Sequence, residues 1–546
     1  MTQTDPRGPD TTTLYRGGVV YRPAGTAGRD ECVATALVVD GERIAWIGSD
    51  EDAATHADGV DAVVELDGAL VAPPFVDAHV HLSATGMGLR SVQLSDAVSL
   101  IQVLERIGQS ARRRAGRPVY APNWDERGWP EQRPPTAQEL DRATYGGVVY
   151  SPRVDGHSAV ISSSLAAACG ARNHPGWHDS GLVTWEAHHA ARDVFYSGIT
   201  PAERRADIDA AMQAAAAAGI GLVHENGGPS LSSEADFAAV LAAGLRGDGP
   251  EVIGYWAELV ADEESARSLA SRMGAWGLAG DLNVDGSIGS RTASLREPYA
   301  DDQEQRGHPY LSVEQIRDHV AAWSLAGLQA GFHVIGDAGG DAVIAGLQAA
   351  AARVGLATVV AARHRLEHLE MVDDDGIKAL AELGVTASVQ PAFHALWGGP
   401  EGMYAARLGR LRAGRMNPFA SMQTLGLSLA FGSDTPVTPF APWEAIRVCV
   451  NGHDGHDSHE AAQRLPPAIA FEAHTRGGWR AAGIDHRGYL APGQPASLVL
   501  WSPGTGQGSG RLTPDRLPDL APGATLPTNL RTVIRGRTVF DRLEVS

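Results

Sequence analysis

The chain is almost devoid of lysine. Lysine and arginine together number 45 among 546 residues, and Lys378 is the one lysine in the sequence. Chemistry that depends on a lysine side chain would therefore have to use this residue. Such chemistry includes a Walker-type phosphate loop, a Schiff base and a carboxylated lysine that bridges two metal ions. The many arginines need no function, because alanine and glycine are also in excess and together indicate biased codon usage.

Cysteine is scarce, and long apolar runs and a basic surplus are missing. Cys32, Cys169 and Cys449 lie far apart without a CxxC pair, which favours a reducing compartment over a disulfide framework. No run approaches about 18 apolar residues, and the N-terminus lacks the features of a signal peptide, so we expect a cytoplasmic protein. The formal net charge of −20 argues against nucleic acid or a membrane as a partner.

The composition is that of an ordinary globular protein, with 43% hydrophobic and 20% charged residues. Its first 70 residues predict short β-strands separated at Gly or Asp, with no helix of useful length. From Ala72 onward, apolar strands alternate with Ala-rich amphipathic helices. This alternation is typical of a parallel sheet with helical crossovers.

Eight such strands close naturally into a (β/α)8 TIM barrel. The predicted strands are residues 70–79, 219–225, 252–258, 281–286, 328–334, 364–368, 386–391 and 427–434. Helical segments such as 312–327, 339–355 and 373–384 separate several of them. The fold class is therefore α/β.

Two further parts interrupt or flank this barrel. Roughly 140 residues separate the first two strands, far more than a loop needs, so residues 83 to about 215 should form an inserted subdomain over the active-site end. Segments 487–503 and 530–541 return to short strands. We predict a composite β-sandwich of residues 1–71 and 486–546, a barrel of residues 72–485, and a flexible linker at 504–510.

Five side chains at predicted strand ends indicate a metal site. His79 and His81 end the first strand, where a period of two points both imidazoles to the same side, as two ligands of one cation require. His333 lies near the end of the fifth strand, His368 ends the sixth and Asp434 ends the eighth. Because the carboxyl ends of barrel strands meet at one face, these side chains should converge on one pocket.

The motifs around these residues resemble those of the metal-dependent amidohydrolase superfamily. They are VAPPFVDAHVHL (71–82), GIGLVHENGG (219–228), DGSIGSRTA (285–293), HVIGDAG (333–339), RHRLEHLEMVDDDGIKALAELGVTASVQP (363–391), LAFGSDTPV (429–437) and GYLAPGQPASLVLW (488–501). The amidohydrolase family 3 branch, which includes N-substituted formamide deformylase-like enzymes, fits best. The resemblance implies a (β/α)8 barrel with a β-sandwich from both termini, and hydrolysis of carbon–nitrogen bonds other than peptide bonds.

The resemblance also implies roles for the five side chains. His79, His81, His333 and Asp434 would be metal ligands. His368 would be either a ligand of a second metal or a contact of the attacking water.

The chain departs from this branch at one position. Members often carry a carboxylated lysine four residues before the Asp of the DGS motif, where this chain has Asp281. Lys378 cannot replace that lysine, because it lies on the helix after the sixth predicted strand. Asp281, Asn283 and Asp285 would share one face of the fourth strand, and Asp281 could still bridge two metals with its shorter side chain.

Our hypothesis from the sequence is one Zn²⁺, or another divalent transition metal, bound by three imidazoles and one carboxylate with a water position left open. A two-metal site bridged by Asp281 is the alternative. Asp434 would take the proton of the activated water and deliver one to the leaving nitrogen, and the metal or His368 would polarise the scissile group.

Five other residues are candidates to contact the substrate or the metal ligands: Glu225, Asp285, Asp155, His157 and Trp124. Each has a structural alternative. Glu225 could face solvent, as could His224 and Glu258 at other strand positions. Asp285 could shape its loop, and Trp124 could pack with Trp129 inside the insertion. Asp155 and His157 could belong to a turn whose backbone is set by Asp155 and Gly156.

Two polar groups are assigned simpler roles. Asp337 should begin or cap the helix that follows the fifth strand. The histidines at 453, 456 and 459 have loop-like spacing between Gly and Asp, which favours a solvated loop over a second metal site.

The favoured function is hydrolysis of a small amide, formamide, lactam or amidine by a metal-activated water. A metal-independent barrel glycosidase that uses Glu225 and Glu258 is one alternative. A non-catalytic barrel that binds a small molecule is another. The partner is a small-molecule substrate in each case, and a homodimer is the default oligomeric expectation.

Overall fold

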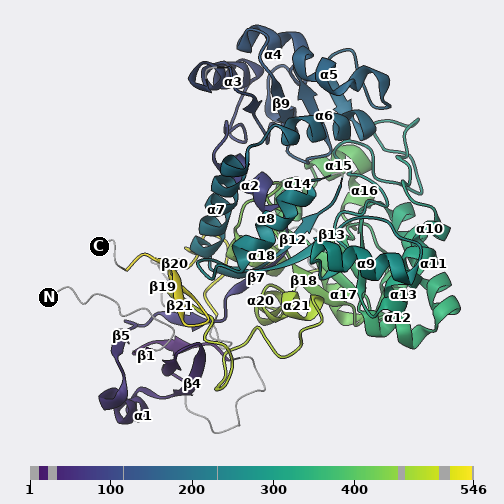
Figure 1. Cartoon of the computed structure of the whole chain (residues 1–546). Coiled ribbons are helices and arrows are strands. Elements are labelled where there is room, and N and C mark those ends of the chain that lie inside the picture. Colours follow the sequence, from purple (N-terminus) through teal and green to yellow (C-terminus); the bar gives the residue numbers. More distant parts are fainter. Residues whose placement is uncertain are drawn as a thin grey trace.

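A computed structural model describes residues 11–22, 34–114, 116–229, 231–452, 462–502 and 517–543. Its largest sheet has eight parallel strands in the order β18-β17-β16-β15-β14-β13-β12-β7, with helices around it (Figure 1). The strands are β7 (Phe75–Val80), β12 (Ile220–Gly227), β13 (Glu251–Trp256), β14 (Gly277–Leu278), β15 (Gln329–Val334), β16 (Arg365–His368), β17 (Thr386–Val389) and β18 (Ser428–Phe431).

The barrel closes just beyond the end of β18. The Asp434 amide donates a hydrogen bond to the His79 carbonyl at 2.8 Å, and the His81 amide donates to the Thr435 carbonyl at 3.0 Å. Between β15 and β16, His333 lies opposite Glu367, and Val334 lies opposite His368. The predicted (β/α)8 barrel is confirmed, and its closure joins two of the predicted metal-binding segments.

The fourth strand begins earlier than predicted: β14 precedes residues 281–286, of which only Asn283 pairs with β15, in an isolated parallel bridge with His333. β14 consists of Gly277 and Leu278, which pair with Gln329 and Ala330 of β15. Gly280 follows with a φ of +87°, a left-handed conformation that ends the strand. Asp281 therefore lies beyond the carboxyl end of β14, and the predicted shared strand face with Asn283 and Asp285 does not form.

Helices of varied length cover the barrel. They are α2 (Leu82–Leu89), α7 (Pro201–Ala217), α8 (Glu234–Gly244), α9 (Glu263–Met273), α10 (Val313–Ala326), α11 (Asp337–Val354), α12 (Leu356–Ala362), α13 (Asp374–Glu382), α14 (Pro391–Trp397), α15 (Met403–Leu408), α16 (Arg410–Ala413), α17 (Phe419–Thr424), α18 (Pro442–Asn451), α20 (Pro467–Ala473) and α21 (Arg476–Ala481). Asp337 begins α11, as predicted. Lys378 is exposed on α13 and pairs with Asp375 at 3.0 Å, so it lies in the outer layer, as predicted.

The long connection between β7 and β12 folds over one end of the barrel (Figure 1). Its elements are α3 (Leu100–Arg114), β8 (Val119–Tyr120), a 3-10 helix (Glu126–Gly128), α4 (Ala137–Thr144), β9 (Val149–Pro152), β10 (Ser158–Ile161), α5 (Ser163–Cys169), a 3-10 helix (Ala171–Asn173), β11 (Leu182–Thr184) and α6 (Trp185–Ser197). The four strands form one sheet with a hydrophobic cluster on either side. Helix α6 lies on the side of this inserted subdomain that faces the barrel (Figure 1).

Strands from both ends of the chain share a sheet with the order β2-β6-β19-β20-β21, which lies beside a second sheet, β4-β3-β1-β5 (Figure 1). The strands are β1 (Thr12–Arg16), β2 (Val19–Val20), β3 (Ala36–Asp40), β4 (Arg43–Gly48), β5 (Ala62–Glu65), β6 (Leu70–Ala72), β19 (Leu498–Ser502), β20 (Thr528–Ile534) and β21 (Arg537–Asp541). Among the described residues of these two chain ends, the only helices are α1 (Asp50–Ala53) and a 3-10 turn (Ala54–Gly59). One hydrophobic cluster joins side chains of both sheets, among them Leu37, Val71 and Leu500. The predicted domain boundaries stay a prediction.

The predicted linker at 504–510 and the three histidines at 453, 456 and 459 lie outside the described residues. Among the described helices, none combines the length and apolar character needed to cross a bilayer.

Candidate metal centre

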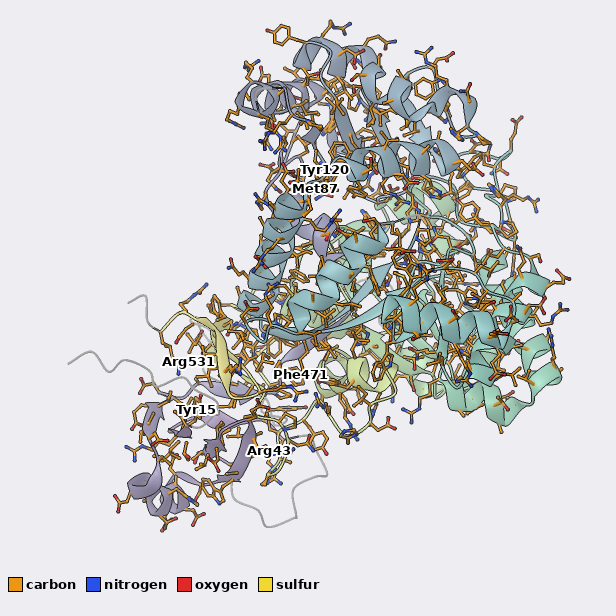
Figure 2. The ribbon with its side chains drawn as sticks, in the orientation of Figure 1. Tyr15, Arg43, Met87, Tyr120, Phe471 and Arg531 are labelled. Carbon is orange, nitrogen blue, oxygen red and sulfur yellow. The ribbon has the colours of Figure 1, made fainter. Side chains whose placement is uncertain are left out.

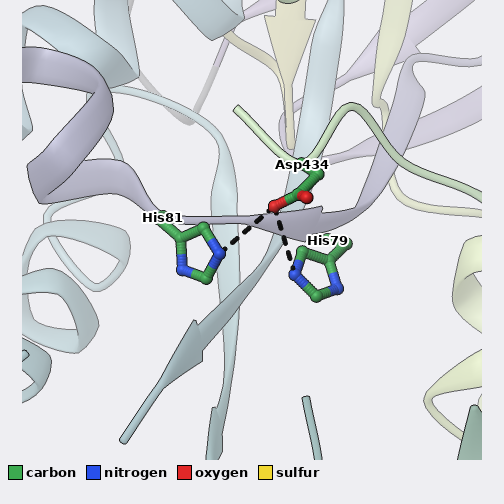
Figure 3. A group of neighbouring side chains, drawn as sticks. All are labelled: His79, His81 and Asp434. Atoms are coloured by element: carbon green, nitrogen blue, oxygen red, sulfur yellow. Dashed lines mark ion pairs between the residues drawn. The ribbon is translucent and has the colours of Figure 1, made fainter. Parts of the chain in front are cut away.

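Strand β7 delivers two histidines to the inside of the barrel mouth. Every residue of this strand is buried, and His79 is fully inaccessible to solvent. His81 follows the strand, immediately before α2, and its side chain is only 17% exposed. Oδ1 of Asp434 lies 3.4 Å from Nε2 of His79 and 3.2 Å from Nε2 of His81 (Figure 3). The predicted HxH pair and its carboxylate therefore meet.

Asp281 lies at the centre of the cluster. Its Oδ2 atom is 3.0 Å from Nε2 of His81 and 3.5 Å from Nε2 of His79. Its Oδ1 atom is 3.4 Å from Nδ1 of His333 and 3.7 Å from Nε2 of His368. Each oxygen of this one carboxylate thus faces a different pair of histidines.

Two overlapping groups of donor atoms could hold a cation: the ligand atoms of His79, His81 and Asp434 lie within 4.8 Å of one another, and so do those of His79, Asp281 and His368. Zinc ligands at about 2.0–2.1 Å in a tetrahedron lie about 3.3 Å from one another. The four measured separations between the imidazoles of His79 and His81 and the carboxylates of Asp281 and Asp434 range from 3.0 to 3.5 Å. Nε2 of His79 and Oδ1 of Asp281 are buried without a hydrogen-bond partner. A cation would satisfy both atoms, since buried polar atoms rarely stay unpaired.

The cluster is strongly coupled electrostatically. Burial opposes protonation of His81, but the carboxylates of Asp281 and Asp434 outweigh it and raise the His81 pKa to about 10. The same carboxylates raise the pKa of His79. Burial opposes ionisation of Asp281 and Asp434, yet the neighbouring imidazoles lower the pKa of both. The metal-free cluster therefore holds protons that a cation would have to displace.

A buried ion pair orients the His79 ring through Nδ1, the ring nitrogen that faces away from Asp281 and Asp434. Its Nδ1 atom lies 2.8 Å from Oε2 of Glu367, and Oε1 of Glu367 accepts a 2.5 Å hydrogen bond from Nε of Arg365. Both charged residues are fully buried. Metal-binding histidines usually donate their second ring N–H to such a partner. This pair is not among the residues predicted from the sequence, although two alternating charges in a strand expected to be buried are a usable signal.

His81 and His368 are oriented in the same way. Nδ1 of His81 lies 2.9 Å from the Asn226 carbonyl oxygen, and Nδ1 of His368 lies 2.8 Å from Oε1 of Gln390. The backbone adds to this arrangement. His368 and Asp434 have φ values of +73° and +55°, a left-handed region that non-glycine residues rarely adopt.

Three of the other candidate residues line the cavity above the cluster. Glu225 is buried, accepts a 2.8 Å hydrogen bond from the Leu82 amide, and has a pKa raised to about 7 by burial. Asp155 is held by Nη1 of Arg153 at 3.0 Å and by Oγ of Ser290 at 2.9 Å. Through Ser290, Asp155 therefore connects the inserted subdomain to the loop after β14.

His157 also reaches the cluster. Its ring packs against that of His333 with 5.1 Å between centroids. Burial lowers the His157 pKa to about 4, with help from His333. A neutral imidazole therefore lies beside the candidate ligands.

Asp285 shapes its loop. Its carboxylate accepts backbone hydrogen bonds from Ser294, Ile335 and Gly336 at 2.8–2.9 Å, and it is fully buried. It lies outside the cavity lining, so of its two interpretations the loop-shaping one holds.

The prediction that Trp124 contacts substrate is wrong. Trp124 is fully buried, its Nε1 donates to the Ser151 carbonyl at 2.9 Å, and its ring packs near Trp129 in the core of the inserted subdomain. An aromatic ring close to a predicted entrance is hard to distinguish from a core ring by sequence alone. Glu258 lies outside the cavity as well and accepts a hydrogen bond from the Trp256 indole.

The cluster opens into a cavity of about 560 Å³. The barrel supplies one side of its lining, including Asp281, His333 and Asp434, and the inserted subdomain supplies the other, including Tyr150 and Arg192. This volume is typical of a small-molecule site and far exceeds what a minimal amide requires.

The chain matches the profile of an amidohydrolase family over residues 62–540. It is 27% identical over 474 residues to Protein LONG AFTER FAR-RED 3 of Arabidopsis thaliana, covering 80% of this chain and 79% of that protein. It is 24% identical over 462 residues to N-substituted formamide deformylase of Arthrobacter pascens, covering 77% of this chain and 81% of that protein. An uncharacterized metal-dependent hydrolase from Pyrococcus horikoshii has the same fold, with a TM-score of 0.71, 24% identity, and coverage of 90% of this chain and 97% of that one.

Proposed function

Because the chain belongs to the amidohydrolase family, we propose that it hydrolyses a small amide, formamide, lactam or amidine with zinc as its cation. The family is one of metal-dependent enzymes that hydrolyse carbon–nitrogen bonds. The choice among these substrate classes and the choice of zinc are our proposals. The observation that carries them is the set of buried imidazole and carboxylate donors at 3.0–3.5 Å spacing.

The first cation position consists of His79, His81, Asp281 and Asp434. The set proposed from sequence had His333 in place of Asp281. The spacing supports the revised set, since Asp281 is within 3.5 Å of both Nε2 atoms of the HxH pair. His333 instead approaches the opposite oxygen of Asp281.

The other oxygen of Asp281, Oδ1, supports a position for a second cation. Oδ1 of Asp281 has no hydrogen-bond partner and faces His333 and His368. We therefore favour the carboxylate-bridged alternative over the single zinc favoured by sequence. Bridging suits a carboxylate because its two oxygens can bind separate cations.

When bound, zinc lowers the pKa of water toward about 7 and polarises a carbonyl or amidine. Asp434 accepts the proton of the attacking water and passes it to the leaving nitrogen, since its carboxylate lies beside both histidines of β7 and faces the cavity. Neutral His157 can donate a hydrogen bond to the oxygen that gains charge. The inserted subdomain covers these groups, and the burial of the Asp434 side chain strengthens its electrostatic interactions.

The two alternatives have less support. A glycosidase needs paired carboxylates at the substrate, but Glu258 lies outside the cavity and Glu225 is engaged by the Leu82 amide. A non-catalytic barrel leaves the family and the four clustered histidines unexplained. The cytoplasmic location, the homodimer and the absence of nucleic-acid and membrane partners remain predictions.

The test combines metal analysis with a substrate panel. Protein reconstituted with zinc is assayed on N-formyl amines, lactams and aryl amides, with and without EDTA. We expect turnover that EDTA abolishes and zinc restores, and two zinc equivalents per chain. His79→Ala and Asp434→Asn should abolish turnover, whereas His486→Ala, which removes an exposed histidine, should not.

A double variant separates the two positions. His333→Ala/His368→Ala should retain about one zinc equivalent, because the first position keeps its ligands. Loss of both equivalents in a folded protein would contradict the division into two positions. Full activity of His79→Ala would overturn the metal mechanism itself.

A further inference from the structure

One of the buried arginines differs from the others. In the described part of the chain, the buried arginines are Arg153, Arg192, Arg365 and Arg531. Three of them pair with carboxylates: Arg153 with Asp155 at 3.0 Å, Arg365 with Glu367 at 2.5 Å, and Arg531 with Asp541 at 2.8 Å. Arg192, only 9% exposed, has no carboxylate within 4 Å among the described residues. Its Nε atom also lacks a hydrogen-bond acceptor.

An unpaired buried guanidinium is costly unless something else supplies its counter-charge. Arg192 lies on the face of α6 that also carries His188 and Tyr196, and all three line the 560 Å³ cavity. The same cavity reaches His81 and Asp281 in the barrel. The free cation is therefore on the inserted-subdomain side of the cavity that contains the metal centre.

The surroundings of Arg192 are aromatic. The Tyr120 and Tyr150 rings stack with 6.0 Å between centroids, and Phe195 packs against both at 5.9 and 5.3 Å. Tyr120 lies next to Met87 of α2 where the inserted subdomain meets the barrel (Figure 2). This end of the cavity therefore suits an apolar or aromatic body that ends in a charged group.

No described carboxylate forms an ion pair with Arg192. Asp193, the next residue along α6, interacts with its charge but is exposed to solvent. Burial and Arg192 itself lower the pKa of His188, and lower that of His189 to about 3, so both imidazoles are neutral. The nearby cavity carboxylates have partners of their own: Asp207 pairs with Arg90 at 2.6 Å, and Asp236 pairs with Arg204 at 3.0 Å. Glu186, on the same helix, is exposed to solvent.

We propose that Arg192 binds a carboxylate of the substrate, so that the enzyme acts on amides whose leaving or acyl portion is an extended, largely apolar acid. This inference deepens the proposed function and rests on it for the position of the scissile bond. A carboxylate fits better than a phosphate, because the planar guanidinium fork matches two carboxylate oxygens. A phosphate dianion would need a second free cation, and Arg204 is already paired.

The first test is of specificity. 4-Formamidobenzoate and its methyl ester form a matched pair, in which the ester lacks the negative charge and gains one methyl group. We expect the wild type to favour the acid over the ester in kcat/KM, and Arg192→Met to reduce that ratio by about 10- to 100-fold. Arg192→Lys, which keeps the charge but loses the fork, should fall between them. Arg172→Met removes an exposed arginine from the same subdomain and should leave the ratio unchanged.

The second test is independent of turnover. Calorimetry with 3-phenylpropionate, an unreactive aromatic acid, should show binding to the zinc-loaded wild type that weakens by about 10- to 100-fold in Arg192→Met. Its methyl ester should bind wild type and variant with similar affinity. If no amide is hydrolysed but this difference persists, the proposed function fails while the carboxylate site stands.

The thermal stability of the Arg192 variant provides a further test. Methionine in place of an unpaired buried cation should leave the Tm unchanged or raise it, whereas Arg153→Met should lower it because Asp155 would be left buried without its partner. An unchanged acid-to-ester ratio together with unchanged 3-phenylpropionate binding in Arg192→Met would overturn the proposal. So would a large loss of Tm, because it would show that Arg192 serves the fold.

Discussion

Oδ2 of Asp281 lies 3.0 Å from Nε2 of His81, although the two residues are 200 positions apart and Asp281 belongs to no strand. The short strand β14 ends at Leu278, and Gly280 turns the chain so that Asp281 enters the barrel mouth. The carboxylate thereby takes the central place in a cluster of four histidines. We therefore expect Asp281 to contribute as much to metal binding as the HxH pair.

Asp281→Asn should weaken zinc binding by more than about 100-fold, because it keeps the shape of the side chain but removes the charge that both histidine pairs face. Competition with a chromogenic chelator measures the affinity. Asp374→Asn removes an exposed carboxylate from α13 and serves as the control. A folded Asp281→Asn protein with wild-type zinc content would contradict the central role of this residue.

Glu367→Gln should weaken zinc binding by about 10- to 100-fold while leaving all proposed ligands in place. Burial favours the neutral acid, but Arg365 and His79 outweigh it and lower the Glu367 pKa to about 2, so this group is a carboxylate near neutral pH. Glutamine keeps a hydrogen bond to Nδ1 of His79 but loses the charge that makes the ring a better ligand.

The same chelator assay measures this effect, with Glu382→Gln on the surface of α13 as the control. Circular dichroism verifies that the variant is folded, since Arg365 loses part of its ion pair. Equal zinc affinity in folded wild-type and variant protein would show that Glu367 serves only the barrel interior.

Much of the fold could be predicted because its signals are local. The HxH pair at the end of a buried strand, the alternation of apolar strands with helices, and the two strand-forming ends of the chain each follow from periodicity. The fourth strand could not, because β14 has only two residues and the polar stretch after it alternates like a strand. The sequence therefore indicates Asp281 as a possible bridge with a side chain shorter than lysine's, and not as the centre of the site.

The roles of residues that depend on contacts between segments far apart in the chain are harder to predict from the sequence. Arg192 lies in an Ala- and His-rich helix whose pattern does not reveal that its guanidinium lacks a partner. Trp124 was misassigned for the converse reason, since only packing against Trp129 and the Ser151 carbonyl identifies it as core.

His319 should make stability fall in acid. It is fully buried on α10, and its Nδ1 accepts a 3.1 Å hydrogen bond from the Val260 amide, so the ring is neutral there. Burial lowers the His319 pKa from 6.5 to about 4. The stability that depends on this neutral ring is fully present above pH 6.5, and it is lost as the pH falls toward 4 because the unfolded chain then binds a proton first.

His319→Asn lacks this titration. Its destabilisation relative to wild type should be largest above pH 6.5 and should shrink by about 1.4 kcal/mol per pH unit as the pH falls to 4. Urea unfolding of metal-free protein at several pH values measures the difference. His486→Asn, at an exposed histidine, should show a difference that does not depend on pH. A constant gap for His319→Asn would mean that folding does not shift the pKa of this ring.

Gly86→Ala should destabilise the protein by about 1–3 kcal/mol or more, whereas Gly88→Ala in the same helix should be neutral or stabilising. A methyl group at Gly86 would lie 1.7 Å from the Asp207 carbonyl oxygen, so α2 and α7 could not keep their contact. At Gly88 the nearest atom would be Cβ of Pro436 at 3.8 Å, which leaves only the gain in helix propensity. Because α2 begins directly after His81, its displacement should also weaken zinc binding in Gly86→Ala. Thermal unfolding measures the change in stability, and the chelator assay measures the change in zinc affinity. If the two alanine variants had equal stability and equal zinc affinity, the α2–α7 contact would neither stabilise the fold nor position His81.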